Sequence, residues 1–220
     1  MQCNTIYGIE MKRIIDKSTW KRKEHFDFFN GMEDPTFGLV VDFDMTKAYK
    51  KCKNLNWSFH KYYHFLSTKA ANEIEEFRTR IEDGKVVVYD KIHSSTTILK
   101  DDKTFAFTFV AMTETFEEFS KLSEVEFERA RKSIGLGMTA ETEAPNMIHY
   151  STIPWVNFRG LKHPISTSFA DSTPKISFGK LEKHSEDKLA MAVGIYGHHG
   201  LMDGYHVGLF VERFQQLLNG

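Results

Sequence analysis

Short β-rich stretches and helical stretches alternate along this chain, without the regular strand–helix–strand spacing of a parallel sheet. The stretches 37–44 (FGLVVDFD) and 85–89 (KVVVY) have the apolar, β-branched composition of strands. The stretch 116–133 instead has apolar residues at helical spacing. This alternation predicts an α/β fold, a two-layer sandwich of helices on a mixed β-sheet.

The same periodicities place the remaining elements. Further strands are expected over 12–16, 95–99, 104–111, 147–151, 175–178 and 189–196. Helices are expected over 19–30, with Ser18 as the capping residue, and over 45–54, 58–75 and 205–218. No linker, repeat or low-complexity segment interrupts the chain, so residues 1–220 are predicted to form a single domain with residues 1–10 as a disordered extension.

Charge, hydropathy and cysteine content exclude several functional classes. The formal net charge of −1 gives no electrostatic basis for capturing nucleic acid or an anionic membrane. No apolar run is long enough to span a bilayer, and the N-terminus lacks the apolar stretch of a signal peptide. The two cysteines, Cys3 and Cys52, do not predict a structural disulfide, and a reducing, cytoplasmic location is expected.

The stretch 194–210 (GIYGHHGLMDGYHVGLF) is the most informative part of the sequence for function. An apolar strand ends in His198 and His199, a loop carries Asp203, and a helix follows. The two histidines are either ordinary turn residues, or metal ligands together with Asp203 and His206, or a site of acid–base catalysis. Their spacing matches no helical HExxH or Cys/His ligand pair, which argues against a metal. An imidazole that removes a proton fits best.

The segment HHGLMDG at 198–204 resembles the HHxxxDG signature of the chloramphenicol acetyltransferase family. Peptide-synthetase condensation domains share this signature, and dihydrolipoamide acyltransferase domains carry a looser HxxxDG. Three further stretches are similar to family segments and occur in the family's order: STWKRKEHFDFF at 18–29, ANEIEEFRTRI at 71–81 and YSTIPWVNF at 150–158. The resemblance thus extends over nearly the whole chain and implies a CoA-dependent acyltransferase-like fold.

The resemblance implies a role for each matching residue. His199, the second histidine of the signature, would be the general base, and the hydroxyl of Ser151 would stabilise the tetrahedral oxyanion. Asp203 would form a structural ion pair with Arg22. The acceptor site would be shaped by Phe28, Phe29, Phe37, Trp155, Asn157 and Ser177, and the CoA-facing stretch would include Lys180.

The implied chemistry is direct acetyl transfer from acetyl-CoA, the co-substrate, to an alcohol, with no metal. A general base contributes about 10²–10⁴ in rate, and one oxyanion donor contributes roughly 10²–10³. No GxSxG elbow occurs, which argues against an acyl-serine intermediate. The resemblance further implies a homotrimer with each site at a subunit boundary.

The expected activity is O-acetylation of chloramphenicol, which confers antibiotic resistance. Phe29 stands where many members have a tyrosine and Glu33 where a leucine is common, so acetylation of another small hydroxylated xenobiotic or metabolite is the alternative. A dihydrolipoamide-type enzyme is disfavoured because it should carry an upstream lipoyl domain. A ligand-binding protein that kept the fold is the non-enzymatic alternative. The presence of all four expected catalytic and structural residues argues against it.

Overall fold

The computed structural model describes residues 11–166 and 171–220, so the extension predicted for residues 1–10 lies outside the described residues. The elements run in the order β1 (Lys12–Ile14), α1 (Lys23–Asn30), β2 (Thr36–Asp44), α2 (Thr46–Leu55), α3 (Phe59–Asn72), a 3₁₀ helix η1 (Glu75–Arg78), β3 (Thr79–Glu82), β4 (Lys85–Tyr89), β5 (His93–Leu99), β6 (Phe105–Phe107), α4 (Phe116–Lys132), β7 (Met147–Thr152), β8 (Lys175–Lys183), β9 (Leu189–His198) and α5 (Gly204–Asn219). Within this part of the chain, no helix is long and apolar enough to cross a membrane.

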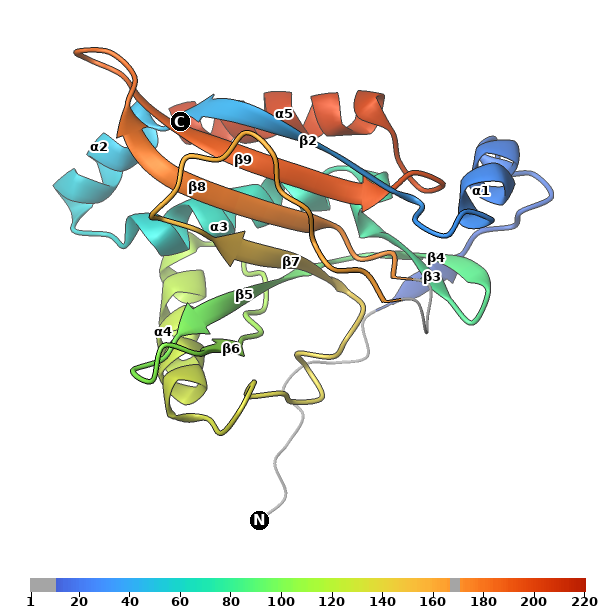
Figure 1. Cartoon of the computed structure of the whole chain (residues 1–220), viewed down its shortest axis with the longest axis horizontal. Coiled ribbons are helices and arrows are strands. Elements are labelled where there is room, and N and C mark those ends of the chain that lie inside the picture. The colour runs from blue at the N-terminus through green and yellow to red at the C-terminus, as the bar shows by residue number, and fades with distance from the viewer. Residues whose placement is uncertain (1–10, 167–170) are drawn as a thin grey trace.

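The large sheet is mixed, as the sequence predicts. Its strand order is β2-β9-β8-β7-β5-β6, and the pairs β5–β7 and β7–β8 are parallel while the others are antiparallel. β1, β4 and β3 form a separate small antiparallel sheet. Helices α3 and α5 lie behind the large sheet in Figure 1, and residues 153–166, which follow β7, cross in front of it. The predicted α/β fold class is therefore confirmed.

Alternation along the two central strands directs large apolar side chains to one face of the sheet. On β7 and β8, Ile148, Tyr150, Ile176 and Phe178 are buried and belong to the main hydrophobic core. The Phe178 ring lies 6.2 Å from that of Phe214 on α5, so this face packs against the helices. Side chains between these positions point to the opposite face, which no helix covers in Figure 1.

The first helix begins later than predicted. Its expected start near residue 19 is wrong because Ser18 does not cap it. Instead, the backbone N–H and the hydroxyl of Ser18 donate to Asp16 Oδ1, at 2.9 and 2.7 Å, in a tight turn. The helix starts at Lys23, and Arg22 occupies the N-cap position without a capping side-chain bond. This leaves the Arg22 guanidinium free to reach elsewhere.

The strand predicted over 104–111 is also wrong in extent. Only Phe105–Phe107 forms strand β6. Beyond it, the Phe109 N–H donates to Glu126 Oε1 of α4 at 2.8 Å. The N–H groups of Thr108 and Val110 still donate to the Thr96 and Ser94 carbonyls of β5, at 2.9 and 2.8 Å, so it is the intervening Phe109 N–H that binds the helix.

Candidate active site

The loop between β9 and α5 carries His199, and close packing fixes its backbone. Leu201 and Met202 are each 1% exposed. A Cβ on Gly197 would lie 2.4 Å from Met202 Sδ, so only glycine allows Met202 to pack against the end of the strand. The loop is consequently held rigidly at the edge of the core.

The His199 ring is oriented by two aromatic side chains and one carbonyl. It stacks on Phe29 at 4.0 Å between centroids and contacts Phe37 at 4.5 Å. Its Nδ1 lies 3.3 Å from the carbonyl oxygen of Met202. A carbonyl only accepts hydrogen bonds, so Nδ1 carries the proton and Nε2 keeps its lone pair. This is the tautomer that a general base requires.

The neighbouring His198 has a different environment. It is 2% exposed, and its Nδ1 accepts a hydrogen bond from the Gly200 N–H at 3.1 Å. Burial lowers the pKa of His198 to about 4, so the ring is neutral near neutral pH. His198 thus supports the loop backbone, whereas His199 presents a free ring nitrogen.

Replacing His198 with asparagine should flatten the acid side of the stability profile. The unfolded chain protonates this histidine below about pH 6.5, whereas the folded chain resists protonation down to about pH 4. The contribution of His198 to the free energy of unfolding is therefore fully present above pH 6.5 and decreases as the pH drops. At pH 5 the decrease amounts to about 2 kcal/mol. Asparagine keeps an acceptor for Gly200 but does not titrate. Urea unfolding at pH 7.5 and 5.0 measures the difference, and an unchanged acid slope would contradict the assignment.

Arg22 and Asp203 form the ion pair that the family resemblance implies. Arg22 Nη1 donates to Asp203 Oδ2 at 2.7 Å, although the two residues are far apart in the chain. The same guanidinium donates to the carbonyl oxygens of His199, at 3.2 Å, and Gly200, at 3.5 Å. Burial raises the pKa of Asp203, but the bond to Arg22 and the neighbouring His206 outweigh it and hold that pKa below its usual value.

Asp203 also starts the last helix. Its Oδ1 accepts from the Tyr205 N–H at 3.0 Å, while its own N–H donates to His206 Nδ1 at 3.1 Å. His206 Nε2 in turn lies 3.3 Å from Glu76 Oε1. These side chains are committed to capping and to fixing the loop. Across residues 11–166 and 171–220, no group of three or more His, Cys, Asp or Glu side chains is arranged to hold a metal ion.

Ser151 lies in a different part of the chain, in a cavity of about 670 Å³. Ser151 pairs in register with Ser177 of β8, which pairs with Gly194 of β9. His199 follows five residues further on. Strand spacings then put Ser151 and His199 of one chain roughly 15–20 Å apart, so one chain does not bring them together.

The other expected site residues are dispersed. Ser177 is fully buried, and its hydroxyl lies 3.0 Å from His163 Nε2. Phe28 and Trp155 are 66% and 69% exposed. Two more lie on the surface near Glu182: Asn157 donates to it at 2.5 Å, and Lys180 forms an ion pair with it at 3.7 Å.

Sequence reasoning missed four polar residues that line the Ser151 cavity: His149, His163, Asp171 and Lys175. A signal for two of them was present. His149 and Lys175 each stand two residues before a serine in a strand, so polar side chains repeat with period two on one sheet face. The other two lie between β7 and β8, where no periodicity marks them.

Comparison with known proteins identifies relatives along almost the whole chain. Residues 11–215 match the family model described as chloramphenicol acetyltransferase. A chloramphenicol acetyltransferase of Bacillus pumilus is 31% identical over 94% of this chain and 94% of its own length. One from Clostridium perfringens is 30% identical over 93% of this chain and 97% of its own.

Structural comparison gives the same result. A solved chloramphenicol acetyltransferase superposes with a TM-score of 0.86 at 30% identity, covering 94% of this chain and 100% of the other. A probable dihydrolipoamide acetyltransferase of Listeria monocytogenes, at 12% identity and a TM-score of 0.67, shares the fold over 89% of this chain and 88% of its own. With a family match over nearly its full length, this chain belongs to the chloramphenicol acetyltransferase family.

Proposed function

We propose that this protein transfers the acetyl group of acetyl-CoA to a hydroxyl of chloramphenicol, an activity that would confer resistance to the antibiotic in the cytoplasm. The observation that carries the proposal is the geometry of His199. Its Nδ1–H donates to the Met202 carbonyl, two aromatic rings hold the imidazole, and Arg22 binds the loop backbone. A basic Nε2 on a rigid loop is what deprotonation of an alcohol needs.

In the proposed mechanism, Nε2 of His199 accepts the proton of the acceptor hydroxyl as its oxygen attacks the thioester carbonyl. The carbonyl π electrons move to oxygen, and the hydroxyl of Ser151 donates a hydrogen bond to the resulting oxyanion. When the intermediate collapses, the carbon–sulfur bond breaks. The departing sulfur takes the proton from His199, which gives the acetyl ester, free CoA and the original imidazole.

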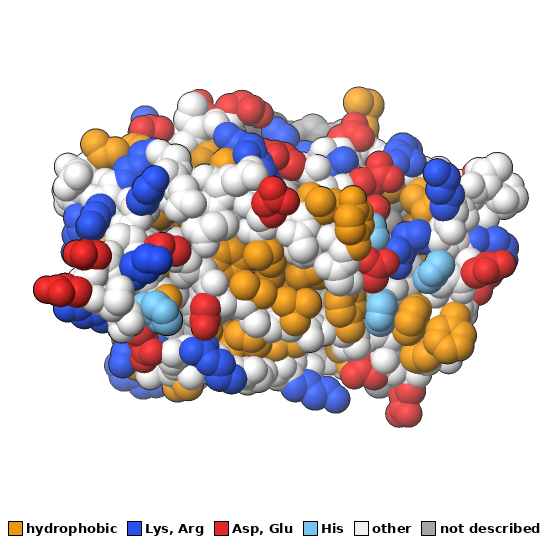
Figure 2. All heavy atoms as spheres, turned by 90° about the horizontal axis from the view of Figure 1, so that it is seen from above, with side chains coloured by type: hydrophobic (Ala, Val, Ile, Leu, Met, Phe, Trp, Pro, Cys, Tyr) orange, Lys and Arg blue, Asp and Glu red, His pale blue; other side chains and the backbone are white. Residues whose placement is uncertain are grey.

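This mechanism requires two chains for each site, because Ser151 and His199 of one chain are roughly 15–20 Å apart. We propose a homotrimer in which His199 of one subunit faces the Ser151 cavity of the next. The outer edge of the large sheet supports such assembly. β2 is an edge strand whose Leu39 and Val41 are only half-buried. Figure 2, which looks down on this edge, shows apolar side chains exposed in the middle of the face.

Mixing two inactive variants should restore activity. A His199→Ala chain retains Ser151, and a Ser151→Ala chain retains His199. In trimers reassembled at random from equal amounts, about one quarter of neighbouring pairs combine an intact base with an intact hydroxyl. Acetyl transfer should therefore return to about one quarter of the wild-type rate. If subunit exchange is confirmed and no activity returns, the site lies within one chain.

The function itself is tested by following CoA thiol release with chloramphenicol as the acceptor. Turnover that depends on both substrates supports the proposal. Turnover with other small alcohols but not with chloramphenicol would favour the alternative, an O-acetyltransferase for another hydroxylated compound. The charged residues in the Ser151 cavity favour that alternative. Binding of an alcohol without any turnover would instead indicate a ligand-binding protein.

A further inference from the structure

Two side chains extend the Ser151 region into a polar strip on the face of the large sheet that no helix covers. His149 and Ser151 alternate on β7, and Lys175 and Ser177 alternate on β8. The register pairs His149 with Lys175, and Ser151 with Ser177. All four side chains therefore point to the same face, and the Cα atoms of Lys175 and Ser151 are roughly 8 Å apart.

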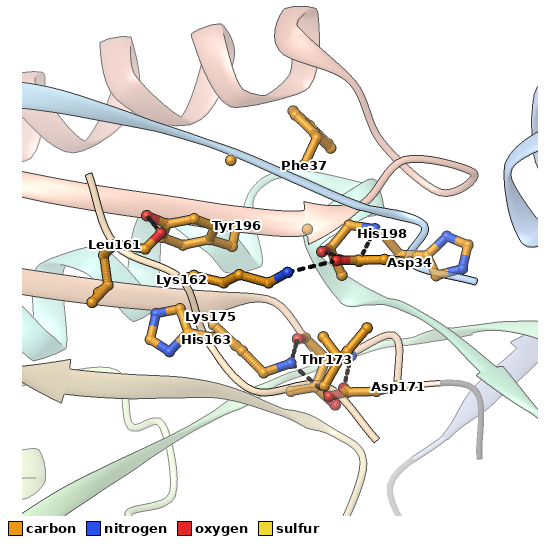
Figure 3. A pocket seen from close by; sticks show the side chains of 14 residues that line it. Asp34, Phe37, Leu161, Lys162, His163, Asp171, Thr173, Lys175, Tyr196 and His198 are labelled. Atoms are coloured by element: carbon orange, nitrogen blue, oxygen red, sulfur yellow. Dashed lines mark hydrogen bonds and ion pairs between the residues drawn. The ribbon is translucent and has the colours of Figure 1, made fainter. Parts of the chain in front are cut away.

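Hydrogen-bonding capacity remains available at the far end of this strip. Lys175 Nζ donates to Asp171 Oδ2 at 2.7 Å and to the Thr173 carbonyl at 3.4 Å, which leaves one of its three N–H groups (Figure 3). The ring of His149 has no hydrogen-bond partner among the described residues and lines the cavity. Burial and the nearby Lys175 lower the pKa of His149 to about 4, so the ring is neutral and offers one N–H donor.

The opposite wall of the cavity is apolar. Phe105, Phe107 and Met138 line it, and Phe105 is 45% exposed. An acceptor with a flat apolar body would rest on these side chains while its reacting hydroxyl lies beside Ser151, where His199 of the neighbouring subunit is proposed to face the cavity. Any substituent extending from that body along β7 and β8 would meet His149 and Lys175. An apolar substituent there would strip water from Lys175 without replacing its hydrogen bond.

We propose that His149 and Lys175 form a subsite for a second oxygen-bearing group of the acceptor, so that the preferred substrate is an alcohol with a carbonyl, carboxylate or hydroxyl group on the far side of an apolar body. This inference rests on the proposed function and names its acceptor class.

The charges around this subsite disfavour binding of an ammonium group. Asp171, the nearby acid, is already bound by Lys175 and by the Thr173 N–H at 3.3 Å. Arg80 is fully buried close behind, where its Nε donates to the Pro145 carbonyl at 2.7 Å and its remaining bonds also go to carbonyl oxygens. A second cation beside Asp171 would be repelled by Lys175 and Arg80, while Glu143, the other acid that lines the cavity, is exposed to solvent.

The test uses four benzyl alcohols that differ only at the para position: methyl, carboxamide, carboxylate and aminomethyl. The oxygen-bearing pair should show a KM about tenfold below that of the methyl compound, because each gains a hydrogen bond from a charged donor. The aminomethyl compound should have the highest KM. The Kd values of the four alcohols, measured by calorimetry, should follow the same order. The subsite can therefore be tested even if no acceptor is acetylated. If chloramphenicol and all four alcohols fail to turn over, the proposed function fails instead.

Lys175→Met should abolish the preference for oxygen, so that the KM values of the methyl, carboxamide and carboxylate compounds converge to within a factor of about two. That change leaves the Asp171 carboxylate without its partner. A Lys175→Met/Asp171→Asn double variant removes both charges and therefore controls for the effect of an unpaired carboxylate. Lys183→Met, an exposed lysine on the same strand, should leave the preference unchanged. A methyl or aminomethyl compound that binds best, or a preference that survives in both Lys175 variants, would overturn the proposal.

Discussion

Replacing His199 with glutamine is expected to lower kcat about 10³-fold with little change in the KM for either substrate. Glutamine fills similar space but cannot take up a proton at neutral pH, so the contribution of a general base is lost. Because His199 is only half-buried and stacks on Phe29 and Phe37 at the surface of the loop, the fold should remain intact. Steady-state kinetics and a thermal melt measure the two effects.

The adjacent histidine provides the matched control. His198→Asn should retain most of the wild-type kcat, since His198 only accepts a hydrogen bond from Gly200. The reverse result, with an inactive His198→Asn and a fully active His199→Gln, would show that the catalytic assignment of the two histidines is wrong.

Removing either partner of the Arg22–Asp203 pair should impair both stability and catalysis. Arg22→Met and Asp203→Asn should each cost about 2 kcal/mol, less than the 3–5 kcal/mol of a fully buried pair. The smaller loss of unfolding free energy is expected because the two side chains are 16% and 33% exposed, so that solvent screens their charges. Arg22 also binds the carbonyls of His199 and Gly200, so its loss should displace the imidazole and lower kcat about 10²-fold.

A double-mutant cycle tests whether the two residues act as a pair. The double variant should lose less free energy of unfolding than the sum of the single losses, because no unpaired charge remains. Lys21→Met, an exposed neighbour of Arg22, should change neither stability nor kcat. Strictly additive losses, or an equal loss in Lys21→Met, would mean that the contact is not energetically important.

Local pattern was sufficient to predict most elements, because strands such as 85–89 and helices such as 116–133 carry strong periodicity. The predicted bounds of elements were wrong where a side chain from another segment formed a hydrogen bond with a backbone N–H group. Asp16 binds Ser18 and delays the first helix, and Glu126 of α4 binds the N–H of Phe109 beyond the end of β6. Hydrogen bonds of this kind depend on packing, which composition does not encode.

The candidate site was predictable only as far as a motif specifies it. The HHxxxDG segment located His199 and Asp203, and Arg22 followed from the family resemblance rather than from its own surroundings. The His149–Lys175 subsite was not anticipated, because it depends on the parallel register of β7 and β8, and register emerges only when strands are placed side by side.

The pairing of β2 with β9 delays folding during synthesis. Residues 36–44 leave the ribosome well before their partners at 190–198 are synthesised. At about 5–20 residues per second, the N-terminal strand waits roughly ten seconds or longer for its neighbour. Until then it is an unpaired, apolar edge exposed to other nascent chains. Translation speed and chaperone supply should therefore control the yield of this protein in cells more than its final stability does.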